Sequence, residues 1–326
     1  MKNSLASMSA ALILAAGVCT AADPPQWAYG TPLPGAAAPA GGAGGAGRGA
    51  APPPDNSPKK LPGSTGEFTN AQIRDGFGPA DWFPGDHPTM PEIVAKGRRP
   101  DVMSCALCHL PNGKGRPENA GVSGLPSTYF VQQMMDFKNG VRKSAESRKA
   151  NTARMGAIAK AMTDEEIKAT AEYFGSMKWT PWIRVVETAT VPKTRLSGGL
   201  FLPLAGDEKE PIGARIIEVP EDQEQTEGFR NPRVGFLAYV PVGSIEKGKA
   251  LVSKGQCARC HGAELKGLGP VPGLAGRSPS YMARQMFDMQ AGARKGPWSD
   301  LMKATVTNMS EADLLNIVAY AASIKP

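Results

Sequence analysis

The chain has 326 residues and a formal net charge of +7, and 41% of its residues are hydrophobic. This length leaves room for two domains of ordinary size. The apolar run from Ala10 to Val18 is too short to span a bilayer, and no other stretch is long enough. The sequence therefore excludes a transmembrane anchor.

Residues 1–22 have the pattern of a secretory signal peptide. Lys2 supplies the charged start, the run from Ala10 to Val18 supplies the apolar core, and small residues end at Ala22. We expect cleavage near Ala22 and a periplasmic location. Cys19 would leave with the leader, so the mature chain would keep four of the five cysteines.

Residues 23–65 are rich in Pro, Ala and Gly, with a Gly-rich run over 41–47 and three prolines over 52–54. Such a composition buries too little apolar surface to offset the entropy of ordering the segment. We expect a disordered tether without secondary structure.

Residues 66–178 are predicted to form a small helical domain. Thr89 to Glu92 has the pattern of a capping box that opens a short helix towards Lys96. A second helix is expected from Tyr129 to Phe137, ended by Gly140. A third opens at a capping box that begins at Thr163, and its apolar face is formed by Ile167, Thr170, Ala171 and Phe174.

Within this domain the sequence Cys105-Ala106-Leu107-Cys108-His109 matches the attachment signature of c-type haem. Two thiols three residues apart on one helical turn can each add to a vinyl group of haem. The imidazole of His109 would then bind the iron. A second copy, Cys257-Ala258-Arg259-Cys260-His261, makes an accidental match implausible.

Two other uses of paired cysteines were weighed. A zinc site expects its pairs about 15–20 residues apart, whereas here about 150 residues intervene and a His follows each pair. A redox-active dithiol of the thioredoxin type expects a βαβ context, which neither motif has. We therefore expect two covalently attached haem c groups, held by Cys105, Cys108, Cys257 and Cys260, with His109 and His261 on the irons.

Residues 179–243 resemble neither domain. Short β-branched stretches around Val185, Thr190 and Ile216 are interrupted by Pro192, Pro211 and Pro220. This pattern favours short extended pieces. We expect an ordered interdomain segment that packs on both domains.

Residues 244–326 repeat the first domain. Tyr129 and Tyr281 each lie 20 residues after the motif His, Gln133 corresponds to Gln285, and the offset of 152 falls to 147 after Gly140 because the first copy has five extra residues. The last helix opens at Ser310, and its apolar face is formed by Leu314, Ile317, Val318 and Ala321. The chain is a tandem duplication.

Each iron bound by one His needs a second ligand or remains open. The only spare His of the mature chain is His87, which we expect to be an ordinary satisfied side chain. Met is the remaining soft ligand. We predict Met155 and Met302, in loops before the last helices, because Met162 and Met309 are better placed to pack on those helices as hydrophobic staples.

These motifs resemble class I cytochromes c, and in particular the periplasmic tandem two-haem type. The resemblance implies a helical fold around each haem, with the first helix of each domain crossing the last, and electron transfer as the activity. It also implies that the carbonyl of Pro272 accepts a hydrogen bond from His261. In the first domain Ala120 stands in the corresponding place. The expected fold class is all-α.

Two six-coordinate haems leave no open position for a substrate. We therefore expect a periplasmic electron carrier between a dehydrogenase or membrane complex and an acceptor cytochrome or oxidase. The alternative is a haem enzyme, a dihaem peroxidase or small-molecule oxidase, with one labile axial ligand. A structural or surface-anchoring role is a weaker third possibility.

The expected partners are redox proteins rather than nucleic acid. The basic residues gather in the extended loop of the first domain, which leads to Met155. We expect this loop to border the haem edge and to steer a partner with an acidic surface. Its basic residues are Lys138, Arg142, Lys143, Arg148, Lys149 and Arg154.

Overall fold

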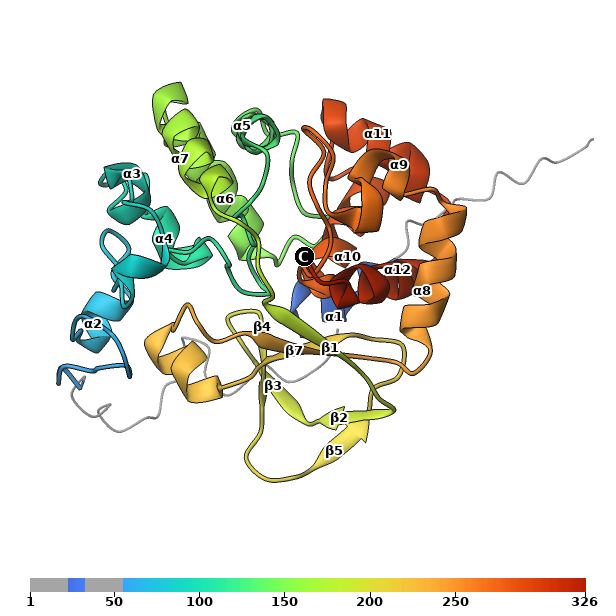
Figure 1. The fold of residues 1–326 in the computed structure, drawn as a ribbon, viewed down its shortest axis with the longest axis horizontal. Helices are drawn as coiled ribbons and strands as arrows, with labels where there is room; N and C mark the ends of the chain where they lie inside the picture. Colours follow the sequence, from blue (N-terminus) through green and yellow to red (C-terminus); the bar gives the residue numbers. More distant parts are fainter. Residues whose placement is uncertain (1–22, 33–54) are drawn as a thin grey trace, which may run out of the picture.

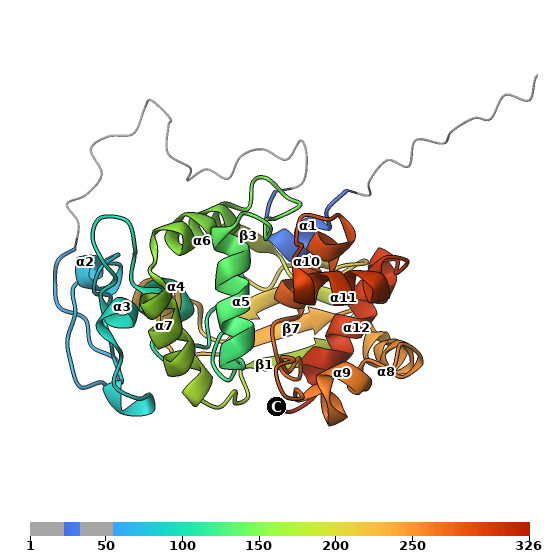
Figure 2. The ribbon, with the colours of Figure 1, turned by 90° about the horizontal axis from the view of Figure 1, so that it is seen from above.

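The structure, a computed structural model, describes residues 23–32 and 55–326. The expected leader, Cys19 and the Gly-rich run of the expected tether lie outside the described residues. Two helical units, formed by the regions around the two motifs, lie side by side (Figures 1 and 2). The strands between them in sequence lie below both units in Figure 1.

The first helical unit contains the long helices α5, α6 and α7 and several single turns. The Thr163 side chain caps α7 in a complete capping box with Glu166, as predicted. The expected capping box at Thr89 is wrong, because the short helix α3 follows Pro91 without a side-chain cap. The helical elements are α2 (Asn70–Ile73), η1 (Pro84–Asp86), α3 (Glu92–Ala95), α4 (Cys105–His109), α5 (Ser127–Lys138), α6 (Ala150–Ala161) and α7 (Asp164–Ser176).

The second helical unit repeats this arrangement with a longer first helix. Helix α8 crosses the last helix α12 closely at Gly248, where an added Cβ would lie 1.9 Å from the carbonyl oxygen of Asn316. Ser310 caps α12 in a capping box with Asp313, as predicted. The elements are α8 (Ser244–Lys254), α9 (Ala258–His261), η3 (Ala263–Leu265), α10 (Pro279–Gln290), α11 (Pro297–Val306) and α12 (Glu311–Ser323).

The predicted apolar faces of α7 and α12 are buried. Phe174 is completely buried in the first unit, and Leu314 is 1% exposed in the second. Burial of a large apolar side chain contributes about 1.5–3 kcal/mol. These two helices therefore anchor the cores of their units.

Residues 179–243 form three small sheets. Strand β7 (Phe236–Val240) pairs in parallel with β1 (Ile183–Glu187) and antiparallel with β6 (Ile217–Pro220). Two antiparallel pairs accompany this sheet: β3 (Thr194–Ser197) with β4 (Leu200–Pro203), which form a hairpin, and β2 (Thr190–Pro192) with β5 (Lys209–Pro211), which flank that hairpin in sequence. The predicted all-α fold therefore holds for the two helical units only, and residues 179–243 add strands where extended pieces were expected.

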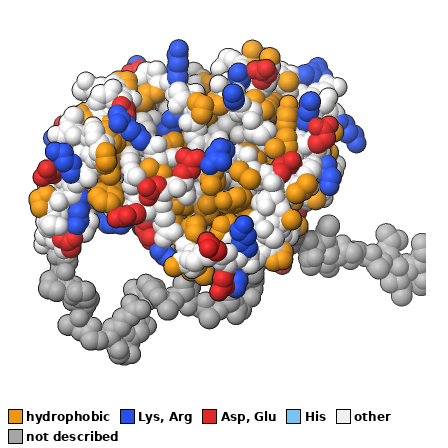
Figure 3. All heavy atoms as spheres, turned by 60° about the horizontal axis from the view of Figure 1, so that its bottom comes forward, with side chains coloured by type: hydrophobic (Ala, Val, Ile, Leu, Met, Phe, Trp, Pro, Cys, Tyr) orange, Lys and Arg blue, Asp and Glu red, His pale blue; other side chains and the backbone are white. Residues whose placement is uncertain are grey.

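The interdomain segment packs on both helical units. On the second unit, β1 contacts α12, and Ile216 and Val240 join its core. On the first unit, the side chain of Trp82 donates a hydrogen bond to Phe229. Figure 3 shows the face beneath the units, where hydrophobic side chains gather near the centre and charged side chains surround them.

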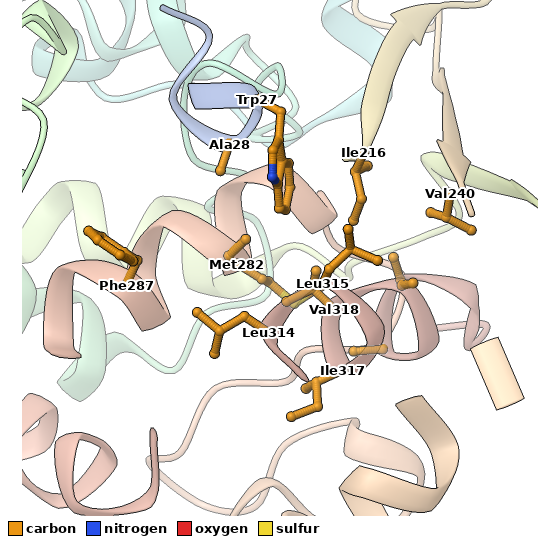
Figure 4. Packing of buried hydrophobic residues seen from close by; sticks show 14 of the residues in the cluster. Trp27, Ala28, Ile216, Val240, Met282, Phe287, Leu314, Leu315, Ile317 and Val318 are labelled. Carbon is orange, nitrogen blue, oxygen red and sulfur yellow. The ribbon is translucent and has the colours of Figure 1, made fainter. Parts of the chain in front are cut away.

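The described start of the chain is part of the second core. Residues Gln26–Tyr29 form the helical turn α1, and Trp27 lies over Leu315 and Val318 of α12 (Figure 4). The buried hydroxyl of Tyr29 donates to Asp288 at 2.7 Å. The expectation of a segment without secondary structure over 23–65 is therefore wrong for this part. Among the described residues, no helix combines the length and apolar character needed to cross a bilayer.

Candidate haem-binding sites

The first motif forms its own helical turn, α4. The hydroxyl of Ser104, immediately before the turn, donates to the carbonyl of Val94 at 2.8 Å and fixes its start. Leu110 has a positive φ of 63° and ends it. The Nδ1 atom of His109 lies 2.8 Å from the carbonyl oxygen of Ala120. A carbonyl only accepts, so Nδ1 carries the proton and Nε2 keeps its lone pair for a metal.

The second motif has the same geometry. Cys257 precedes the turn α9, and Nδ1 of His261 lies 2.8 Å from the carbonyl oxygen of Pro272. The two carbonyl partners occupy corresponding positions in the repeat, and Ala120 supports its His at the same distance as Pro272. Replacement of the proline by alanine thus leaves this hydrogen bond intact.

The electrostatic surroundings keep both imidazoles neutral. Burial lowers the pKa of His109 and of His261 below the ordinary value, and the hydrogen bond to the carbonyl opposes this effect. A neutral imidazole is the form that binds iron. Burial also raises the pKa of the Cys105 thiol to about 12, so this thiol is not a reactive thiolate of the dithiol-exchange type.

A cleft with a mostly apolar lining opens beside the first motif. Its walls include Cys105, Cys108 and His109, together with apolar side chains from α5, α6 and α7 such as Phe130 and Phe174. Thiols, the free imidazole nitrogen and an apolar wall thus converge in one place, as covalent haem requires. Polar side chains of the second unit, including Tyr281 and Arg284, also line the cleft.

No zinc-like donor set competes with this interpretation. Within residues 23–32 and 55–326, no three His, Cys, Asp or Glu side chains cluster in a way that could hold a metal ion. The four cysteines of the motifs are not paired with one another in disulfides.

The structure places the two predicted Met ligands on helices. Met155 lies on α6 and lines the first cleft with Cys108 and His109, and Met302 lies half-buried on α11. The expectation that both Met residues lie in loops is therefore wrong. Met162 also lines the first cleft, but it is 2% exposed and packs in the core with Ile167, as the hydrophobic staple predicts.

His87 is a satisfied side chain, as predicted. Its ring contacts the carbonyl of Pro88, the carboxylate of Asp81 and the hydroxyl of Tyr173 at 2.8–3.2 Å. Both ring nitrogens are thereby occupied.

The two units meet through a pair of arginines related by the repeat. Arg142 donates to Tyr281 and Gln285 of the second unit, and Arg294 donates to Tyr129 and Gln133 of the first, all at 2.7–3.0 Å. The repeat relates these Tyr and Gln residues between the copies, but the role of the arginines was not predicted. Their common offset of 152 residues was the signal that could have found them.

The basic loop of the first domain is largely an internal contact. Lys149 is 6% exposed and donates to the carbonyl of Tyr29, and Arg142 lies in the contact between the units. Arg148 pairs with Glu146 at 2.6 Å. The expectation that all six basic residues form a free rim is therefore wrong.

Comparisons with known proteins agree with the two motifs. The family model for cytochrome c matches residues 94–178 and 245–325, which together make up just over half of the chain. A thiosulfate dehydrogenase electron acceptor from Thiomonas intermedia (strain K12) is 25% identical over 228 residues, covering 69% of this chain and 80% of that protein. A cytochrome c4 from Azotobacter vinelandii is 23% identical over 221 residues, covering 66% and 82%.

Among solved structures, a thiosulfate dehydrogenase from Marichromatium purpuratum matches with a TM-score of 0.46 and 22% identity. The match covers 71% of this chain and 38% of that one. Each of the two segments matched by the family model contains one attachment motif, which implies covalently bound haem c in both. The chain belongs to the cytochrome c family, with two cytochrome c segments in tandem.

Proposed function

We propose that this protein is an exported dihaem electron carrier, which accepts electrons from a dehydrogenase of sulfur compounds and passes them to an acceptor cytochrome or oxidase. Haem held at each motif would supply one-electron redox chemistry. The observation that carries the proposal is the duplicated histidine geometry, with Nδ1 of His109 and His261 held by a carbonyl and Nε2 free. The printed name of the Thiomonas relative, an electron acceptor for thiosulfate dehydrogenase, supports the donor class.

In this proposal Met155 and Met302 complete the coordination of the two irons. Met155 already lies in the wall of the cleft that contains Cys105, Cys108 and His109. A thioether raises the reduction potential relative to a second His. With both faces of each iron occupied by protein, the carrier role is favoured over the enzyme.

The acidic partner is proposed to dock where positive charge remains exposed at the first cleft. Lys143 and Arg154 are both exposed and both line this cleft. They replace the larger basic rim expected from the sequence. Their field would raise the rate of encounter more than the final affinity.

The test is reduction of the oxidised protein by a purified thiosulfate dehydrogenase. With thiosulfate present, both haems should become reduced only when the dehydrogenase is added. Reduction by thiosulfate in the absence of the dehydrogenase would favour the haem enzyme with a labile ligand. No reduction under either condition would exclude this donor.

A further inference from the structure

The stretch from Gln225 to Arg233 of the interdomain segment contacts the first helical unit next to its haem motif. It begins as a π-helical turn, η2 (Gln225–Phe229). Asn112 donates to the carbonyl of Pro232 at 2.7 Å, and Arg233 forms an ion pair with Asp86 at 2.6 Å. On the other side of Arg230, Trp82 donates to the carbonyl of Phe229 at 2.8 Å, so contacts on both sides fix its position.

Arg230 points at the motif itself. Its backbone is left-handed, with φ 53° and ψ 39°, and its N–H donates to the carbonyl of Gln225. Its guanidinium donates to the carbonyl of Leu107, the residue between the two haem-attaching cysteines that directly precedes Cys108.

The guanidinium of Arg230 is partly buried, but it stays positively charged. Burial, reinforced by the nearby charge of Arg116, lowers the pKa of Arg230 to about 10, so the side chain remains a cation at neutral pH. The neighbouring carboxylate, Glu118, is 2% exposed and forms its ion pair with Arg116 at 2.5 Å. With Arg154, which also lines the cleft, these groups leave a net positive charge beside the first motif.

The second motif is built differently at the same place. Its residue corresponding to Leu107 is Arg259, whose side chain is exposed and donates to Gln256 at 2.7 Å. A charge in contact with water is screened, whereas a buried charge acts strongly on its surroundings. The repeat therefore differs in the charge that it places near each haem.

We propose that Arg230 is a potential-setting residue, by which the interdomain segment raises the reduction potential of the first haem without changing that of the second. The inference rests on the proposed function, because it requires haem at the first motif. On reduction the ferric iron gains one electron from a small redox mediator and becomes ferrous, and no bond is made or broken. The charge of the site falls by one, so a nearby fixed cation favours the reduced form.

The test is a spectroelectrochemical titration of the two-haem protein and of Arg230→Gln. Loss of the cation should make reduction of the first haem less favourable. The equilibrium constant for electron transfer from the second haem to the first should fall about tenfold, which corresponds to a fall of about 59 mV in the potential of the first haem. One potential should fall while the other stays. Arg230→Lys should retain most of the wild-type value. Arg215→Gln is the control, because it removes an arginine of the same interdomain segment whose charge is already balanced by Glu210.

A second variant tests the sign of this electrostatic effect on the reduction potential without changing Arg230. Glu118→Gln removes the negative charge and should raise the same potential that Arg230→Gln lowers. Unchanged potentials, equal shifts of both haems, or a Lys variant that behaves like the Gln variant would overturn the inference. If the potentials failed this test while a haemochrome assay still found two haems in the variants, the inference about Arg230 would be wrong and the proposed function would remain. A chain without covalent haem would overturn both.

Discussion

Arg142 and Arg294 face each other across the contact between the two cytochrome c segments as partners in an isolated antiparallel bridge. Their backbones are bonded through the neighbouring residues, since Lys143 N–H donates to Ala293 and Lys295 N–H donates to Val141. Each guanidinium then reaches the Tyr and Gln of the opposite segment. The duplicated halves therefore meet through equivalent residues, as in a symmetric dimer.

Replacement of Arg294 by Met should weaken this contact. Arg294 is 3% exposed, and its removal leaves the buried side-chain oxygen of Gln133 without one of its charged donors. We expect the free energy of unfolding to fall by about 1–3 kcal/mol, measured by urea denaturation. Arg184→Met is the control, because its pair with Glu221 is exposed and should contribute at most about 1 kcal/mol. Equal losses in both variants would contradict a structural role for this contact.

Lys114 should make stability depend on pH. Burial, and next the charge of Arg277, lower its pKa from 10.5 to about 8. Between pH 8 and 10.5 the unfolded chain therefore holds a proton that the folded chain has lost, so this lysine makes stability rise with pH across that window. The contribution reaches at most about 1.4 kcal/mol per pH unit.

The difference between wild type and Lys114→Met isolates this effect, because other groups titrate alike in both. Chemical denaturation at pH 8, 9 and 10 should give a smaller rise in the variant. Parallel curves would show that Lys114 retains its proton in the folded protein throughout this window.

Several features of the fold and of the sites followed from sequence alone. The repeat, the two attachment motifs and the capped helices α7 and α12 were predictable, because each depends on neighbouring residues or on helical periodicity. The bond from His261 to Pro272 was correctly expected from the family resemblance. The carbonyl of Ala120 could take the same role because the bond uses the backbone.

Other features depend on partners distant in sequence. The turn α1 has four residues, too few for a periodic pattern, and Tyr29 is buried only because Asp288 and α10 receive it. Strands of only three to five residues pair across gaps that no local pattern specifies. From the sequence Lys149 is expected to be a solvated charge, but in the structure its ammonium group donates to the carbonyl of Tyr29.

The axial Met assignments predict a spectroscopic result. The oxidised protein should show the weak long-wavelength sulfur-to-iron absorption band for both haems. Met155→Ala and Met302→Ala should each remove about half of it, because each variant removes one thioether ligand. The controls Met162→Leu and Met309→Leu conserve volume in the core and should leave the band unchanged. A band that is unchanged in Met155→Ala but falls by about half in Met162→Leu would assign the ligand to Met162.

The docking proposal predicts a dependence on salt. The second-order rate of reduction by an acidic partner should fall as the ionic strength rises towards 0.15 M, where the Debye length is about 8 Å. Lys143→Glu with Arg154→Glu should slow this rate several-fold at low salt. The control is Lys168→Glu, which reverses an exposed charge on α7. A rate unaffected by salt and by the double reversal would place docking on another face.

Covalent haem stoichiometry tests the central claim most directly. After acid–acetone extraction, the mass of the exported wild-type protein should exceed that of its polypeptide by two haem groups. Cys105→Ala with Cys108→Ala should leave one, because the motif at Cys257 and Cys260 remains. A purified protein that carries zinc and no haem, or that loses all its haem to the extraction, would contradict the account.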